Sequence, residues 1–171
     1  QDIVVVLFQG LSAATAVILG NELGAGKIKR AEKYATQFFI LQFIVTIASA
    51  FVVIGIRGPL IGLYNITEAV GRDVNICILI FACYMPAKMF NYVNVVGVLR
   101  SGGDTKMCLF LDTSGVWCIG VPLAFLGALV WHLPIYVVYG LVMLEEVYKA
   151  VLGYIRYRQK KWLRNLTVQV R

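Results

Sequence analysis

Five long apolar runs constrain this chain more than any other feature. An α-helix rises about 1.5 Å per residue, so about 20 apolar residues cross a hydrocarbon core about 30 Å thick. Of the 171 residues, 60% are hydrophobic and 15% are charged, whereas soluble domains carry about 25% charged residues. We therefore expect an all-α integral membrane protein with five transmembrane helices at residues about 1–23, 34–56, 74–99, 107–130 and 133–157, followed by a tail over 158–171.

The basic residues predict the topology. The loop over 24–33 carries four Lys or Arg residues, the loop over 100–106 carries two and the tail from Arg156 carries six, whereas the facing loops carry Arg57 and Arg72. Because cytoplasmic loops retain Lys and Arg, we expect the two basic loops and the C-terminus to be cytoplasmic. The net charge of +7 then reflects topology, and we expect no nucleic-acid partner because nucleic-acid binding needs a basic surface that faces water.

Five helices that end inside must start outside, so we expect further helices upstream. The chain begins with Gln1 rather than Met and is interpreted as a fragment of a longer protein.

Ionisable side chains inside the apolar runs are the candidate functional residues. Such groups cost about 2.5–3.5 kcal/mol each at the centre of a membrane helix, so they face protein or a wet cavity. Lys88 lies fourteen residues after the start of its run and eleven before the end, which places it near the midplane. Asn91 and Asn94 follow it at helical spacing and extend a polar flank.

The last run carries Glu145, Glu146 and Lys149. One carboxylate can pair with Lys149 along the helix, and the other needs a partner on another helix or must take up a proton. We therefore predict one interior polar cluster of Lys88, Glu145 and Glu146, and a substrate- or cation-binding site of Lys88, Asn91, Asn94, Glu145 and Glu146. The alternative, a structural ion pair that joins two helices, stays open at this stage.

The weaker candidates are Asp112 and Lys149, for which we expect a structural or coupling role. Asp112 is five residues into its run, near the interface. The cysteines Cys77, Cys83, Cys108 and Cys118 all lie inside apolar runs without a Cys-x-x-Cys spacing, and His132 is the single histidine. We interpret the cysteines as small buried apolar side chains, and we expect no metal site, no cofactor and no catalytic residue.

Three stretches resemble one family, the multidrug and toxic compound extrusion (MATE) transporters in their bacterial, firmicute-type branch. The most specific stretch is Gly97-Val98-Leu99-Arg100-Ser101-Gly102-Gly103-Asp104-Thr105-Lys106, followed by Phe110, Asp112, Trp117 and Pro122. The other two are residues 10–26 with the basic segment after them, and Leu144-Glu145-Glu146-Val147-Tyr148-Lys149 with Gly153, Arg156 and Lys161-Trp162.

The resemblance implies helices eight to twelve of a twelve-helix, two-lobe transporter in a bacterial inner membrane, so that 1–171 is a partial C-terminal lobe. It further implies alternating access, with organic cations, drugs or metabolites exported in exchange for protons or sodium. The implied partners are a small-molecule substrate, a coupling ion, the lipid bilayer and the missing N-terminal lobe. A lipid-linked oligosaccharide flippase of the same superfamily is the alternative.

The sequence departs from the family pattern in one respect. Family members with a sodium site in the second lobe carry an acidic residue on the helix that here holds Lys88, Met89 and Asn91. No carboxylate stands there in this chain, so a sodium site in this lobe does not carry over.

The predicted topology can be tested by cysteine labelling in intact cells. In a cysteine-free background, a cysteine at position 165 should react with a membrane-impermeant reagent only after permeabilisation, because the basic tail stays in the cytoplasm. Thr67→Cys, in a facing loop, is the matched control and should react in intact cells. Labelling of position 165 from outside would contradict the topology.

Overall fold

The computed structural model describes residues 2–64 and 66–163, and within them the regular structure is entirely helical. Position 165 and the rest of the tail beyond residue 163 lie outside the described residues. The elements are α1 (Asp2–Gly24), α2 (Ile28–Gly62), α3 (Glu68–Asn91), η1 (Tyr92–Leu99), α4 (Thr105–Gly115), η2 (Val116–Gly120), α5 (Val121–Phe125), η3 (Leu126–Val130) and α6 (Ile135–Arg158), where η marks π-helical turns.

Several of these elements join without a break, so the described chain forms five helical rods. The α3 helix runs directly into η1, and we call this continuous stretch rod 3 (Glu68–Leu99). Likewise α4, η2, α5 and η3 form rod 4 (Thr105–Val130). The other three rods are α1, α2 and α6, each a single α-helix.

Four of the rods are long and apolar enough to cross a membrane, by length and composition: Val5–Gly24 within α1, α2, rod 3 and rod 4. The fifth, α6, has 24 residues and is about 36 Å long, but Glu145, Glu146 and Lys149 interrupt its apolar sequence. A charged helix is tolerated at membrane depth where neighbouring helices cover it, and α6 packs against α3 and rod 4. The predicted all-α membrane fold is confirmed.

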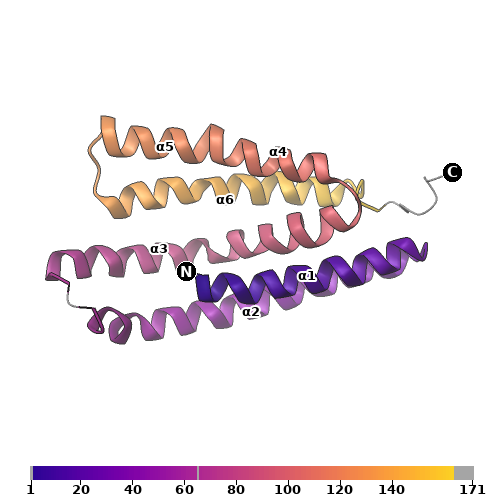
Figure 1. Ribbon diagram of the computed structural model, residues 1–171, viewed down its shortest axis with the longest axis horizontal. Helices are drawn as coiled ribbons and strands as arrows, with labels where there is room; N and C mark the ends of the chain where they lie inside the picture. The colour runs from indigo at the N-terminus through magenta and orange to yellow at the C-terminus, as the bar shows by residue number, and fades with distance from the viewer. Residues whose placement is uncertain (1, 65, 164–171) are drawn as a thin grey trace.

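The rods lie side by side in a stacked order (Figure 1). In that view α6 lies between rod 4 and α3, while α1 and α2 lie on the opposite side of rod 3. The α1–α2 turn, the 100–104 loop and the C-terminal end of α6 gather at one end of the bundle. We call this the basic end, because it carries the basic loops.

The helix ends follow from turn chemistry and from charge. Gly26 and Gly103 adopt φ of 72° and 76°, a conformation that glycine takes without strain and that reverses the chain after α1 and after η1. Helix α2 begins at Ile28 and ends at Gly62, beyond the expected 34–56 at both ends. The expected bounds covered only the uncharged residues that cross the hydrocarbon core. The helix itself continues into the membrane interface, where charged side chains reach water.

Two apolar clusters hold the bundle together. The cluster at the basic end joins α1, α2, rod 3 and α4 through Leu19, Leu23, Ala31, Ala35, Val95, Val98, Leu99, Cys108, Leu111 and Trp162. The second contains Phe8 of α1 and Phe81, Met85 and Met89 of α3. Rod 3 and α1 both contribute to the two clusters, and rod 3 also packs against α6, so it is the central element of the bundle.

Much of the apolar surface remains outside these clusters. Phe51, Trp117 and Leu129 are 72%, 67% and 61% exposed, which suits helices whose surroundings are apolar. The interpretation of all four cysteines as buried was wrong for Cys83 and Cys118, which are exposed. In a membrane protein an apolar run does not distinguish the core from the lipid-facing surface.

Close packing of α1 on rod 3 makes Gly97 sensitive to substitution. A Cβ atom there would meet the Thr15 side chain at 3.0 Å, tighter than ordinary contact. We expect Gly97→Val to lower the melting temperature in detergent, with a loss of about 1–3 kcal/mol from overpacking. Gly55→Val is the matched control, because nothing lies within 4 Å of its Cβ position. Equal melting temperatures for the two variants would contradict this packing.

Candidate functional site

A polar cluster spans the interface between α3 and α6. The ammonium Nζ of Lys88 lies 3.8 Å from Oε1 of Glu146. Asn91, one turn further along α3, donates its Nδ2–H to Oε2 of Glu146 at 2.9 Å and to the Glu146 backbone carbonyl at 2.8 Å. The bond to a backbone carbonyl fixes Asn91 against α6. The predicted proximity of Lys88 to the glutamate pair is therefore confirmed.

Lys149 completes the cluster from one turn along α6. Its Nζ lies 3.4 Å from Oε2 of Glu146 and 3.5 Å from Oε1 of Glu145, so one ammonium group bridges both carboxylates. Two ammonium groups thus face two carboxylates, and the cluster is neutral when all four groups are ionised. The four side chains are 17% exposed or less. Ion pairs at such burial hold helices together only when each charge is compensated, as it is here.

Gly115 and Gly120 allow rod 4 to approach this cluster closely, and neither was among the residues predicted from the sequence. A Cβ on Gly115 would lie 2.9 Å from Cγ and Cδ of Lys149, and a Cβ on Gly120 would lie 2.5 Å from Oε2 of Glu145. Their five-residue spacing suits one face of a π-helical segment such as η2. The signal in the sequence was the recurrence of glycine in an apolar run, which permits close helix approach in membranes.

The two asparagines leave polar atoms without protein partners. Oδ1 of Asn91 and both amide atoms of Asn94 are buried without a hydrogen-bond partner among the described residues. Asn94 is fully buried on η1, and its Nδ2 lies 2.7 Å from the Cβ position of Gly153 on α6. Buried polar atoms are nearly always hydrogen-bonded, so these atoms have hydrogen-bonding capacity for water or a ligand.

Asp112 forms no hydrogen bond or ion pair with the cluster, although Lys149 and Arg100 attract its carboxylate and Glu146 repels it. It lies on α4 with an exposed side chain, and among the described residues it has neither a hydrogen bond nor an ion pair. Its helix begins at Thr105, so Asp112 lies about 10 Å along the rod from its start. The described residues also contain no group of three or more His, Cys, Asp or Glu side chains placed to hold a metal ion.

Comparison with known proteins decides the family. The family model described as MatE matches residues 1–126, which is most of the chain. The chain belongs to the MatE family. No solved structure gives a significant match.

Three relatives of this MatE chain come from two bacteria and a mammal. The uncharacterized transporter YisQ of Bacillus subtilis (strain 168) is 21% identical over 153 residues, covering 90% of this chain and 33% of that protein. Human multidrug and toxin extrusion protein 1 is 25% identical over 151 residues, covering 85% and 26%. The multidrug resistance protein MdtK of Yersinia pseudotuberculosis is 27% identical over 128 residues, covering 74% and 27%. The chain therefore spans about a quarter to a third of the length of these relatives.

The geometry predicts how stability responds to loss of Lys88. Lys88→Ala removes one of the two ammonium groups beside Glu146, so the free energy of unfolding should fall by about 1–3 kcal/mol. This is less than the 3–5 kcal/mol typical of a broken buried pair, because Lys149 and Asn91 still contact that carboxylate.

Thermal unfolding in detergent measures this effect. Lys88→Arg keeps the charge and should be milder. Lys106→Ala removes an exposed lysine at the basic end and should leave the melting temperature unchanged. A Lys88→Ala protein as stable as the Lys106→Ala control would show that the Lys88–Glu146 pair contributes nothing.

Proposed function

We propose that this chain is part of a secondary active antiporter that exports organic cations, drugs or metabolites by alternating access. Membership of the MatE family supports transport, and two of the relatives carry names that describe multidrug extrusion or resistance. The observation that supports a role in coupling is the charge-balanced cluster of Lys88, Glu145, Glu146 and Lys149 at the α3–α6 interface. Ionisable groups at this depth typically mark ion and substrate pathways.

The cluster favours proton exchange over sodium binding. Each carboxylate already has an ammonium group within 3.8 Å, and these cations repel a sodium ion. A proton on Glu146 would cancel one negative charge and leave Lys88 and Lys149 with a single carboxylate between them. The resulting excess positive charge would be costly in a low-dielectric site, and it would favour separation of α3 from α6. Protonation of Glu146 is therefore proposed as the step that loosens this interface.

The asparagines of rod 3 supply hydrogen-bonding groups for the proposed substrate. Asn91 and Asn94 carry the unpartnered amide atoms described above, and their oxygens can accept hydrogen bonds from a cationic or amine-bearing substrate while both glutamates are ionised. Lys88, Asn91, Asn94, Glu145 and Glu146 thus form the proposed substrate- and cation-binding site. Lys149 is proposed as the coupling residue that links the two glutamates.

Asp112 is proposed to face an aqueous cavity. A carboxylate without a hydrogen bond or ion pair among the described residues needs water or further charge inside an apolar helix, because Lys149 and Arg100 attract Asp112 without forming an ion pair with it. A second lobe packed across a water-filled cavity would satisfy this requirement. The bundle is accordingly proposed to be helices eight to twelve of a twelve-helix protein, with an N-terminal lobe as its partner.

The proposed location is a bacterial inner membrane, with the basic end in the cytoplasm. This orientation agrees with the charge bias of the loops. An enzymatic role is not proposed, because the polar cluster lacks a nucleophile with an adjacent base. The lipid-linked oligosaccharide flippase is not proposed either, because two of the relatives carry names that describe multidrug extrusion or resistance.

Reconstitution of the complete transporter in proteoliposomes tests the function. A pH gradient should drive export of an organic cation, and a sodium gradient should not. Glu146→Gln removes the proposed proton carrier and should lower transport by about a hundredfold, while Lys106→Ala should transport normally.

Three outcomes would contradict parts of the proposal. Full activity of Glu146→Gln would remove the coupling role of the cluster. Transport driven by sodium alone would show that the coupling ion is wrong. Transport by vesicles that contain only residues 1–171 would show that no second lobe is required.

A further inference from the structure

The chain reverses direction just after α6 and folds back onto the basic end. Helix α6 ends at Arg158, and Lys160 adopts a φ of 55°, a left-handed conformation that is uncommon for residues other than glycine. The Lys160 N–H donates to the Tyr157 carbonyl at 3.0 Å, and the Leu163 N–H donates to the Lys160 carbonyl at 3.1 Å. A disfavoured conformation persists only where its surroundings hold it in place, so contacts with the rest of the bundle must stabilise this turn.

Trp162 is the strongest of these contacts. Its side chain is fully buried and belongs to the cluster that contains Leu19 and Leu23 of α1 and Ala31 and Ala35 of α2. The indole Nε1–H donates to the Tyr157 carbonyl at 3.3 Å, so the polar atom is satisfied within the turn. A large aromatic side chain near the chain terminus is thus inserted into the core of the α1–α2 hairpin.

The 100–104 loop has the shape that this insertion requires. A Cβ atom on Gly102 would lie 1.8 Å from the Trp162 carbonyl oxygen and 2.6 Å from its carbonyl carbon. Because these are backbone atoms, they cannot swing aside, and only glycine fits at position 102. The turn therefore contacts the loop between rod 3 and rod 4 as well as the α1–α2 hairpin.

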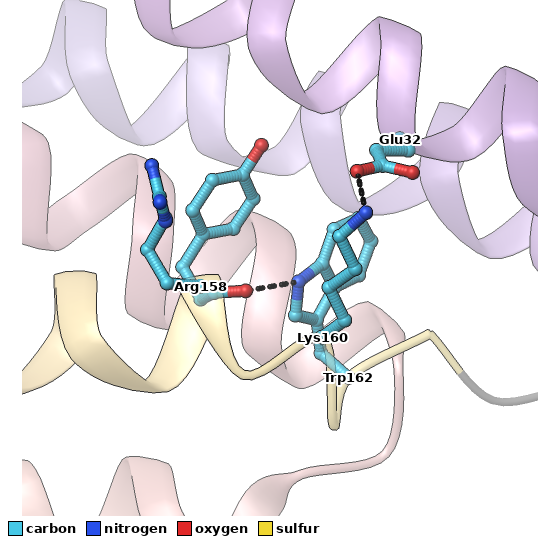
Figure 2. A pocket seen from close by; sticks show the side chains of 5 residues that line it. Glu32, Arg158, Lys160 and Trp162 are labelled. Atoms are coloured by element: carbon cyan, nitrogen blue, oxygen red, sulfur yellow. Dashed lines mark hydrogen bonds and ion pairs between the residues drawn. The ribbon is translucent and has the colours of Figure 1, made fainter.

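Charged groups add two further connections. Arg156 forms a two-point ion pair with Asp104, with Nε to Oδ2 at 2.5 Å and Nη2 to Oδ1 at 2.9 Å. Asp104 occupies the N-cap position of α4, but its carboxylate makes no cap hydrogen bond because it binds Arg156. On the other side, Lys160 Nζ lies 2.5 Å from Oε1 of Glu32 on α2. Figure 2 shows Lys160 reaching Glu32 above the ring of Trp162.

The turn thus connects parts of the bundle that have few other contacts. Rod 3 lies between α6 and the α1–α2 pair (Figure 1), and the main neighbours of α6 are α3 and rod 4. Tyr157 adds a link across this gap, because its ring packs edge-on against Phe39 of α2 with centroids 4.9 Å apart. Without the turn, α6 and α2 would be joined chiefly through rod 3.

We propose that residues 156–162, which we call the C-terminal clamp, hold α6 and rod 4 fixed relative to the α1–α2 hairpin, with Trp162 as its positioning residue. The clamp makes the basic end of the bundle move as one rigid body during transport. This inference rests on the proposed transport function, but the rigidity itself is independent of what is transported. Trp162 dominates the clamp, because exposed ion pairs such as Glu32–Lys160, with side chains 39% and 61% exposed, contribute little.

A cross-linking rescue tests the clamp in the complete transporter. In a cysteine-free background that is otherwise active, Trp162→Ala should reduce transport by about tenfold. Adding Glu32→Cys and Lys160→Cys, joined by a short thiol-specific bifunctional reagent, should restore most of that activity. The same cross-link in protein that retains Trp162 should leave transport unchanged, because the clamp stays closed throughout the cycle. Trp162→Phe should be mild, and Lys106→Ala, at an exposed lysine outside the clamp, should match the parent.

Two transport results would overturn the proposal. If the cross-link inactivates the parent protein, the segment must open during transport and is not a permanent clamp. If the cross-link forms in Trp162→Ala without restoring transport, Trp162 acts in another way than by holding the helices.

A distance measurement separates failure of the clamp from failure of the transport proposal. Spin labels at positions 33 and 106, both exposed, report the separation of α2 and α4 in purified protein. Their distance distribution should be narrow in the parent and broad in Trp162→Ala, whether or not any tested substrate is transported. An unchanged distance distribution in Trp162→Ala would overturn the clamp. A broadened distribution in a protein that exports none of the tested substrates would support the clamp and contradict the proposed transport function.

Discussion

The requirement that a charge at membrane depth must be compensated governs the centre of this bundle. Glu146 meets two ammonium groups and the amide of Asn91 within 3.8 Å. These contacts draw α6 against α3, and they explain why a helix with three charged residues in its middle packs among four more apolar rods. Glycines on rod 4 then let its backbone approach Lys149 and Glu145. The placement of the last two rods thus follows from one electrostatic constraint.

The middle and the C-terminal end of α6 have different physical functions. Its middle carries ionisable groups, and a single proton can change their net charge, so this part can act as a switch. Its C-terminal end and the turn after it carry Arg156, Tyr157 and Trp162, whose contacts combine a two-point ion pair, stacked rings and a fully buried indole. None of these contacts depends on proton uptake by a group at membrane depth. A helix that is adjustable in its centre and fixed at its end can transmit a local charge change to the whole bundle.

Two polar side chains have hydrogen-bonding capacity that the described residues do not satisfy. Asn94 is buried, and neither of its amide atoms has a hydrogen-bond partner among the described residues, whereas Asp112 is exposed on rod 4. Lys149 and Arg100 attract Asp112 without forming an ion pair with it. Both side chains can therefore bind water or a ligand, which suits the proposed water-filled cavity beside the bundle.

The sequence by itself determined the five rods, their turns and the depth of Lys88 and Glu146, because apolar run length, glycine and charge act through local rules. It also predicted that these groups meet, since two lone charges at one depth have few other partners. Only the tertiary structure decided that Asp104 binds Arg156 instead of capping α4, that Cys83 is exposed, and that Gly102 and Trp162 touch. These outcomes depend on which helix faces which, and in a membrane an apolar face can turn toward lipid or protein at nearly equal free energy.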